Sequence, residues 1–207
     1  MRLAAAIACF ACLGIARADD RKPKMAQAPS DEDFVDLTTV IPDAVIDMRY
    51  ATANNFTKRS LYASPTCKLR RAVAARLAKA ADALRGQERR LLVWDCYRPV
   101  SVQKVMWKLV PDPRYVADPA HGSRHNCGAS IDVGLVDKDG AAVVLPTNHD
   151  DFSTAAHSDR ALAGKRGLEA RKLDAAMSAA GFAGLATEWW HFDAPDASKY
   201  AQSDDPL

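Results

Sequence analysis

The sequence predicts a single α+β domain with a central, mostly antiparallel sheet flanked by helices. Strand and helix patterns follow one another along the 207 residues without the regular alternation of a doubly wound parallel sheet. An Asp139-Gly140 turn signal between two apolar runs indicates a hairpin, as antiparallel strands allow. The chain length suits one domain.

The first half of the chain predicts two strands, a helix and a further strand. Residues 34–40 and 44–50 are apolar runs separated by a proline-containing turn. A helix is predicted over residues 68–85, where apolar side chains recur at helical spacing and Gly86 supplies a stop. Residues 91–94 form a continuous apolar run, typical of a strand buried on both faces.

The second half adds two helices and the remaining strands. Pro99 ends the preceding strand, and Ser101 is the expected N-cap of the next helix. Gly181 ends the last predicted helix, the aromatic run before Asp193 favours a strand, and the tail after Asp196 is expected to be loose. The elements expected here are helices over 102–109 and 168–180, and strands over 129–136, 142–145 and 187–193.

The amino-terminal end has the pattern of a secretory signal. Arg2 precedes a short apolar run, and Ala16-Arg17-Ala18 matches a cleavage site. The alternatives are an uncleaved anchor or a lipoprotein signal ending at Cys9 or Cys12. Export would place the mature protein in the periplasm or outside the cell.

We therefore divide the chain into a signal peptide (1–18), a flexible N-terminal segment (19–33) and one folded domain (34–207). No other apolar stretch is long enough to cross a membrane. The formal net charge of +2 gives no indication of a nucleic-acid partner. The sequence does not fix an oligomeric state.

Two segments about sixty residues apart contain metal-ligand residue types. His125 precedes a predicted strand that contains Asp132, and Glu188 and His191 lie in the last predicted strand. Two imidazoles and one carboxylate suit a catalytic zinc site with an open position for water, and the other carboxylate can serve as general base. Each pair alone also fits a hydrogen-bonded structural pair, but their combination favours a zinc hydrolase. Glu188 must then sit at a strand entrance or a bulge, because residues three apart on a regular strand face opposite sides.

The remaining candidates are one arginine and three histidines. Arg98 follows the buried strand, where its guanidinium would stabilise an oxyanion or, alternatively, pair with Asp95. His121, His149 and His157 have no partner at a ligand spacing, and His157 is the one we expect nearest the site.

Four segments, in chain order, resemble the VanX-type D-alanyl-D-alanine dipeptidases, a family of zinc D,D-peptidases. The segments are residues 46–56, 94–99, 123–132 and 188–191, and the resemblance spans about residues 34–193. It implies the fold shared with D,D-carboxypeptidases and the hedgehog signalling domain. It also implies one Zn²⁺ per chain and a small dipeptide substrate.

The resemblance also assigns roles within the site. It implies that His125, Asp132 and His191 hold zinc, that Glu188 is the general base and then the general acid, and that Arg98 stabilises the oxyanion.

The same resemblance implies that Ser123, Asp151 and Tyr50 define the dipeptide pocket, with the Asp151 carboxylate pairing with the substrate ammonium and Asp150 adjacent to it. Cys127 departs from the family, which often has arginine there. The segment between Trp107 and His125 is shorter than in the resistance enzymes, so a more open pocket rim is expected.

Three cysteines follow the predicted signal, and an odd number in an oxidising compartment predicts one disulfide and one free thiol. Cys67 precedes the first helix and Cys96 ends the next strand, so we expect these two to form the disulfide and Cys127 to stay unpaired.

The expected function is hydrolysis of the D-alanyl-D-alanine dipeptide to free D-alanine, in peptidoglycan turnover or D-Ala recycling. One alternative is a D,D-carboxypeptidase that acts on peptidoglycan stem peptides, which would differ at the amine end of the pocket. Another is a zinc-containing binding module without catalysis, which the presence of both Glu188 and Arg98 disfavours.

Overall fold

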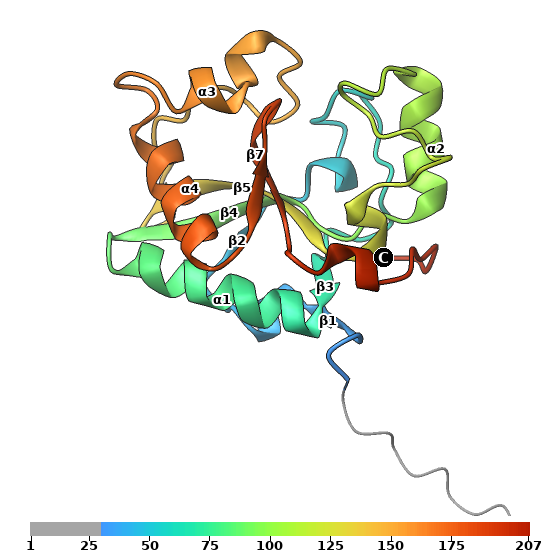
Figure 1. Cartoon of the computed structure of the whole chain (residues 1–207), viewed down its shortest axis with the longest axis horizontal. Helices are drawn as coiled ribbons and strands as arrows, with labels where there is room; N and C mark the ends of the chain where they lie inside the picture. The colour runs from blue at the N-terminus through green and yellow to red at the C-terminus, as the bar shows by residue number, and fades with distance from the viewer. Residues whose placement is uncertain (1–29) are drawn as a thin grey trace, which may run out of the picture.

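A five-stranded sheet in the order β2-β4-β5-β7-β6 organises the protein (Figure 1). The structure is a computed structural model and describes residues 30–207, so the predicted signal peptide lies outside the described residues. Strand β2 pairs with β4 in parallel, and every other neighbouring pair in this sheet is antiparallel. The α+β fold with a mostly antiparallel sheet is therefore confirmed. The strands are β2 (Val45–Ile46), β4 (Arg89–Asp95), β5 (Ser130–Asp137), β6 (Ala183–Leu185) and β7 (Glu188–Asp193).

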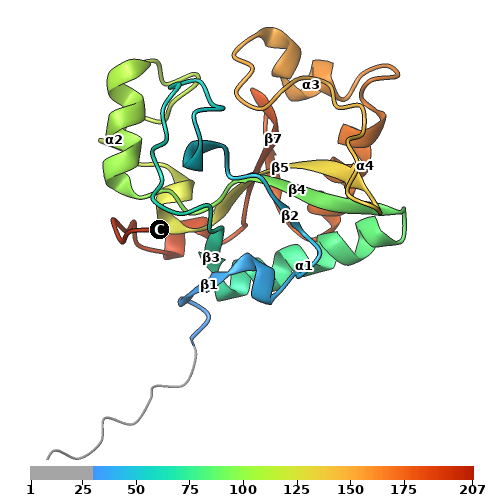
Figure 2. The same ribbon diagram turned by 180° about the vertical axis from the view of Figure 1, so that it is seen from behind.

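Two helices, α1 (Arg71–Arg85) and α4 (Leu168–Ala179), pack against each other and against β4 and β5. Their predicted apolar faces are buried, since Leu77, Leu84 and Leu173 are fully inaccessible. Helix α2 (Val100–Leu109) lies at the other end of the molecule, among the loops, and α3 (Ser158–Ala161) is a short turn (Figures 1 and 2). The core thus lies between the sheet and the α1–α4 pair, which leaves the loop end free to form a site.

A second, two-stranded sheet accounts for two differences from the predicted boundaries. Strand β3 (Lys68–Arg70) pairs antiparallel with β1 (Phe34–Asp36), so the predicted helix over 68–85 starts three residues later. Strand β1 ends early because the Asp36 carboxylate accepts a hydrogen bond from the Thr38 amide at 2.9 Å and caps a 3-10 turn.

The loop end of the molecule also differs from the prediction. Helix α2 starts directly after Pro99, and the Ser101 amide donates to the Asp204 carboxylate at 2.7 Å, so Ser101 is not the N-cap. The tail is not loose, because the Ser203 amide donates to the Asn126 carbonyl at 2.9 Å. Such pairing between residues distant in the chain cannot be seen in local sequence patterns.

One strand prediction near the sheet edges is wrong, and one strand of the structure was not predicted. The predicted strand over 142–145 contributes a single bridge between Val136 and Ala142. Strand β6 was not predicted, because all three of its residues are exposed and it therefore lacks the alternating burial that marks a strand.

The predicted disulfide between Cys67 and Cys96 is confirmed. It joins the residue before β3 to the residue after β4, across a sequence separation of 29 residues. Cys127 is half-buried and has no disulfide partner within residues 30–207. In the same residues no helix is both long and apolar enough to cross a membrane.

Replacing Cys67 with serine should lower the free energy of unfolding by about 3 kcal/mol, because the broken cross-link returns loop entropy to the unfolded chain. Denaturant unfolding followed by circular dichroism measures this change. Cys127→Ser is the matched control and should change stability by less than about 1 kcal/mol. Equal stability of the two variants would show that the cross-link does not stabilise the fold.

Candidate metal centre

The pairing of three adjacent strands places two carboxylates and one imidazole side by side across the sheet. Asp95 on β4 is opposite Asp132 on β5, and Asp132 is opposite His191 on β7. Directly opposed residues in antiparallel strands lie on the same face with their Cβ atoms about 5 Å apart. The sheet register therefore brings Asp132 and His191 together, and both are buried.

His125 reaches the same point from a tight turn before β5. The Ser123 hydroxyl accepts a hydrogen bond from the His125 amide at 3.2 Å and caps this turn. The turn ends at Gly128, whose φ of 67° lies in the left-handed region. A Cβ there would stand 2.3 Å from the Phe34 ring, so only glycine fits.

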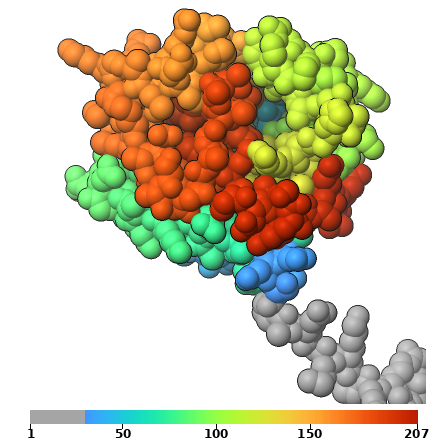
Figure 3. Space-filling view, viewed as in Figure 1, coloured from blue at the N-terminus to red at the C-terminus, as the bar shows by residue number. Residues whose placement is uncertain are grey.

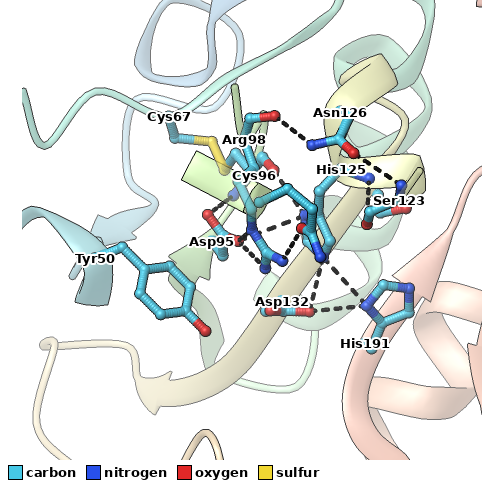
Figure 4. A network of polar contacts seen from close by, with 12 residues as sticks. Tyr50, Cys67, Asp95, Cys96, Arg98, Ser123, His125, Asn126, Asp132 and His191 are labelled. Atoms are coloured by element: carbon cyan, nitrogen blue, oxygen red, sulfur yellow. Dashed lines mark hydrogen bonds and ion pairs between the residues drawn. A yellow bond between two sulfur atoms is a disulfide. The ribbon is translucent and has the colours of Figure 1, made fainter. Parts of the chain in front are cut away.

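Three possible metal-donor atoms, one each from His125, Asp132 and His191, converge at this point. His125 Nε2 lies 3.2 Å from His191 Nδ1 and 3.4 Å from Asp132 Oδ1, and the last two atoms are 3.1 Å apart (Figure 4). Ligands about 2.0–2.1 Å from a tetrahedral zinc ion are about 3.3 Å from one another. The spacing of the three donors thus fits a zinc ion, which His125, Asp132 and His191 would hold.

The outer nitrogens of both imidazoles are held by hydrogen bonds. His125 Nδ1 lies 2.7 Å from the Cys96 carbonyl, which requires an N–H there and leaves Nε2 as an acceptor. His191 Nε2 lies 2.9 Å from Asp193 Oδ1, which directs Nδ1 toward Asp132 and His125. Two imidazole nitrogens and a carboxylate then face one another, an arrangement that either a proton on His191 or a bound metal ion stabilises.

Glu188 reaches the site because β7 is irregular. Leu185 pairs with Glu188 while the preceding residue, Gly184, pairs with Phe192, so β7 bulges between its two contacts with β6. Glu188 is also the first residue of β7. The predicted requirement for a strand entrance or a bulge is therefore met, and Glu188 Oε2 lies 3.9 Å from His191 Nδ1.

Burial raises the pKa of Glu188 to about 7. His191 opposes this shift, whereas the nearby carboxylates of Asp132 and Asp150 add to it. A carboxylate with a pKa near neutrality can take up and release a proton at physiological pH, which is the property of a general base.

Arg98 forms the ion pair with Asp95 that was one of its two predicted roles. The Asp95 Oδ2 atom accepts hydrogen bonds from Nε at 3.0 Å and from Nη2 at 2.5 Å, and Gln103 accepts one from Nη1 at 2.8 Å. The pair is buried, and its geometry fixes the guanidinium at the wall of the metal cavity. Tyr62 completes the network by donating to the other Asp95 oxygen at 2.6 Å.

The structure corrects the predicted acidic residue of the pocket. Asp150, not Asp151, lines the cavity, and the Tyr50 hydroxyl donates to its two oxygens at 2.9 and 3.1 Å. Asp150 has a φ of 59°, and this left-handed turn directs it inward. The Asp151 carboxylate instead accepts a hydrogen bond from the Ser153 amide at 2.9 Å.

His149, rather than His157, is the additional histidine of the site. Its Nε2 lies 3.1 Å from Asp132 Oδ2 and its Nδ1 lies 3.4 Å from Asp150 Oδ2, so it bridges the two carboxylates. His157 precedes α3 and does not line the metal cavity. The sequence did not predict a place for His149 in the site, because no ligand spacing links it to another residue. The one available signal was its position directly before Asp150.

The site opens into a cavity of about 330 Å³. One part of its wall is polar, with Tyr50 and Asp150 at one end and Glu188 beside the three metal donors. Another part is apolar and comes from the loops around α2. The predicted residues of the site therefore all line this cavity, except Asp151. Those on its wall are Tyr50, Arg98, Ser123, His125, Asp132, Glu188 and His191.

A buried histidine–aspartate–histidine cluster beside a raised-pKa glutamate, on a mostly antiparallel α+β fold, defines a metallopeptidase-type site. Residues 30–205 match the family model described as D-ala-D-ala dipeptidase. The chain therefore belongs to the D-Ala-D-Ala dipeptidase family of zinc metallopeptidases.

Several curated relatives can be aligned with this chain over most of their length. The chain is 33% identical over 169 residues to D-alanyl-D-alanine dipeptidase of Escherichia coli (strain K12), which covers 81% of this chain and 88% of the relative. It is 28% identical over 185 residues to the Streptomyces coelicolor protein of the same name, covering 77% and 90%. For the Enterococcus faecium protein of that name, the identity is 24% over 192 residues, covering 81% and 95%.

Zinc binding to the metal-free protein should release about one proton at pH 7. Burial lowers the pKa of His191, but hydrogen bonds to Asp132 and Asp193 raise it to about 10, so the metal-free imidazole is protonated at neutral pH. Because zinc must displace this proton, affinity should fall as the pH falls below about 10. Titration calorimetry in phosphate and Tris buffers measures the release, and a binding heat independent of buffer would contradict it.

Asp193→Asn should weaken zinc binding by about 10- to 100-fold, because it removes the carboxylate that orients His191. Competition with a chromophoric chelator measures the affinity. The exposed Asp196 provides a control, since Asp196→Asn should leave affinity unchanged. Parent-like affinity of Asp193→Asn would show that His191 is oriented without this hydrogen bond.

Proposed function

We propose that this protein uses one zinc ion per chain to hydrolyse D-alanyl-D-alanine to free D-alanine. The observation that carries the proposal is Glu188, a carboxylate with a pKa raised to about 7, beside three converging metal donors. The three relatives described above are named D-alanyl-D-alanine dipeptidases.

The amine end of the cavity favours a dipeptide over a longer chain. Asp150 can pair with a substrate ammonium, while Tyr50 holds that carboxylate in place. Phe56 and Tyr115 line the cavity, and both rings pack on Phe152, with centroids 5.3 and 4.7 Å from it. Three loops are thus joined around this end, which supports a dipeptidase over a D,D-carboxypeptidase that must admit a stem peptide.

The chemistry follows from the positions of the side chains. Zinc held by His125, Asp132 and His191 would supply Lewis acidity toward the scissile carbonyl and a water molecule. Glu188 would take the proton of that water and pass it to the leaving amine. The Arg98 guanidinium, fixed by Asp95, would stabilise the oxyanion that forms at the carbonyl oxygen.

We also propose that the mature protein acts in the periplasm or outside the cell, where it recovers D-alanine from peptidoglycan turnover. The signal-like sequence of residues 1–18 supports export. The disulfide between Cys67 and Cys96 suits an oxidising compartment. Cell fractionation tests this proposal, and a mature protein found in the cytoplasm would refute it.

Glu188→Ala should keep its zinc and its fold but lower kcat on D-alanyl-D-alanine by at least about 100-fold, the effect of losing a general base. Release of D-alanine measures activity, and metal analysis measures zinc. Glu32→Ala, at an exposed residue, is the control and should behave like the parent protein. Loss of zinc together with activity would make Glu188 a metal ligand instead.

The parent protein in the same assay distinguishes the two candidate activities. A zinc-loaded dipeptidase should release D-alanine from D-alanyl-D-alanine and leave a stem pentapeptide intact. Release of terminal D-alanine from the pentapeptide alone would favour the D,D-carboxypeptidase.

A further inference from the structure

His149 is a buried imidazole that the chemistry described above does not use. Its side chain is only 2% exposed, and it does not line the metal cavity, whereas the two carboxylates that it contacts, Asp132 and Asp150, do. Figure 3 shows this face of the molecule hollowed between β7 and the loop around residues 115–125, and both segments contribute to the wall of the metal cavity. His149 lies behind that wall, so it can act on a substrate only through the residues that it contacts.

The first contact of His149 gives the two oxygens of Asp132 different partners. Asp132 Oδ1 lies 3.1 Å from His191 Nδ1 and 3.4 Å from His125 Nε2, so this oxygen faces the other metal donors. Asp132 Oδ2 lies 3.1 Å from His149 Nε2. Because a carboxylate oxygen accepts and an imidazole N–H donates, this contact fixes the carboxylate with one oxygen toward the metal centre.

The second contact of the same ring is with the amine end of the cavity. His149 Nδ1 lies 3.4 Å from Asp150 Oδ2, and Asp150 is the next residue in the chain. The Tyr50 hydroxyl holds this carboxylate from its other side. One rigid imidazole therefore stands between Asp132, at the metal centre, and Asp150, and it sets the separation of the two carboxylates.

Aromatic rings hold the imidazole in place but do not explain its nitrogens. The centroid of the His149 ring lies 5.3 Å from that of Trp94 on β4, 5.5 Å from that of Trp190 on β7 and 6.0 Å from that of Tyr50. A phenylalanine ring would fill the same space. Only an imidazole also presents a nitrogen to each carboxylate, so packing alone does not account for a histidine here.

We propose that His149 is a positioning residue that holds Asp132 toward the metal through Nε2 and Asp150 toward the substrate ammonium through Nδ1. The part of the inference that concerns Asp150 rests on the proposed function. The ring thus fixes the distance between the metal centre and the ammonium, which is the length that a substrate has on the amine side of the cleaved bond. Metal binding and substrate binding depend on different nitrogens of the same side chain.

Three substitutions of His149 separate the two contacts. His149→Phe keeps a planar ring among the aromatic side chains and removes both nitrogens. In His149→Gln the amide nitrogen takes the place of Nε2 and keeps the contact with Asp132, whereas in His149→Asn it takes the place of Nδ1 and keeps the contact with Asp150. His157 does not line the metal cavity, so His157→Phe is the matched control.

Zinc affinity, measured by competition with a chromophoric chelator, should fall about 10- to 100-fold in His149→Phe and His149→Asn but less than about threefold in His149→Gln. The KM for D-Ala-D-Ala, measured on zinc-saturated protein, should rise about tenfold in His149→Phe and His149→Gln but less than about threefold in His149→Asn, since a misplaced carboxylate binds the ammonium less well. His157→Phe should change neither quantity.

Parent-like zinc affinity and KM in His149→Phe would overturn the inference and leave His149 as a packing residue. Equal zinc affinities in the glutamine and asparagine variants would overturn it as well, and this comparison decides the matter even if the phenylalanine variant does not fold. If the parent protein cleaves no D-Ala-D-Ala, the proposed function fails, and the zinc affinities alone then test His149. Tighter zinc binding by His149→Gln than by His149→Asn would support its role, and the reverse order would refute it.

Discussion

The register between β4, β5 and β7 is the constraint on which the rest of the site depends. A shift of one residue between β5 and β7 would turn either Asp132 or His191 to the opposite face of the sheet and separate the metal donors. The buried side chains of β5 oppose such a shift, because every residue from Ser130 to Val136 is buried. Packing of the core and geometry of the metal centre are therefore enforced by the same strand pairing.

The position of His125, which lies in a turn and not in a strand, depends on contacts with that sheet. The Cys96 carbonyl orients His125, and the disulfide to Cys67 anchors Cys96 in turn. Asn126 is fully buried and donates to the Arg98 carbonyl at 2.8 Å, so the turn that contains His125 is fixed to the end of β4. The C-terminal tail closes the arrangement through Ser203, whose amide donates to the Asn126 carbonyl. Segments that are far apart in the chain thus together fix the position of the His125 imidazole.

Charge balance explains why so many ionisable groups can be buried at one end of the domain. Asp95 is paired with Arg98, and Asp193 is paired with His191 and Arg124. Burial of each carboxylate alone would be costly, and the paired cation with its hydrogen bonds offsets that cost. Glu188 lacks such a cationic partner at hydrogen-bonding distance in the described chain, which is why burial shifts its pKa upward.

Local sequence patterns determined the α+β class, the faces of α1 and α4, and the chemical types in the metal centre, because periodicity and ligand chemistry are properties of short segments. The resemblance in four ordered segments added the predicted pocket role of Tyr50. Only the tertiary structure decided that Asp150 faces inward instead of Asp151, and that His149 bridges two carboxylates. It also decided that the C-terminal tail packs back onto the turn that contains His125. These features depend on a left-handed backbone turn and on contacts between segments far apart in the chain, which no local pattern contains.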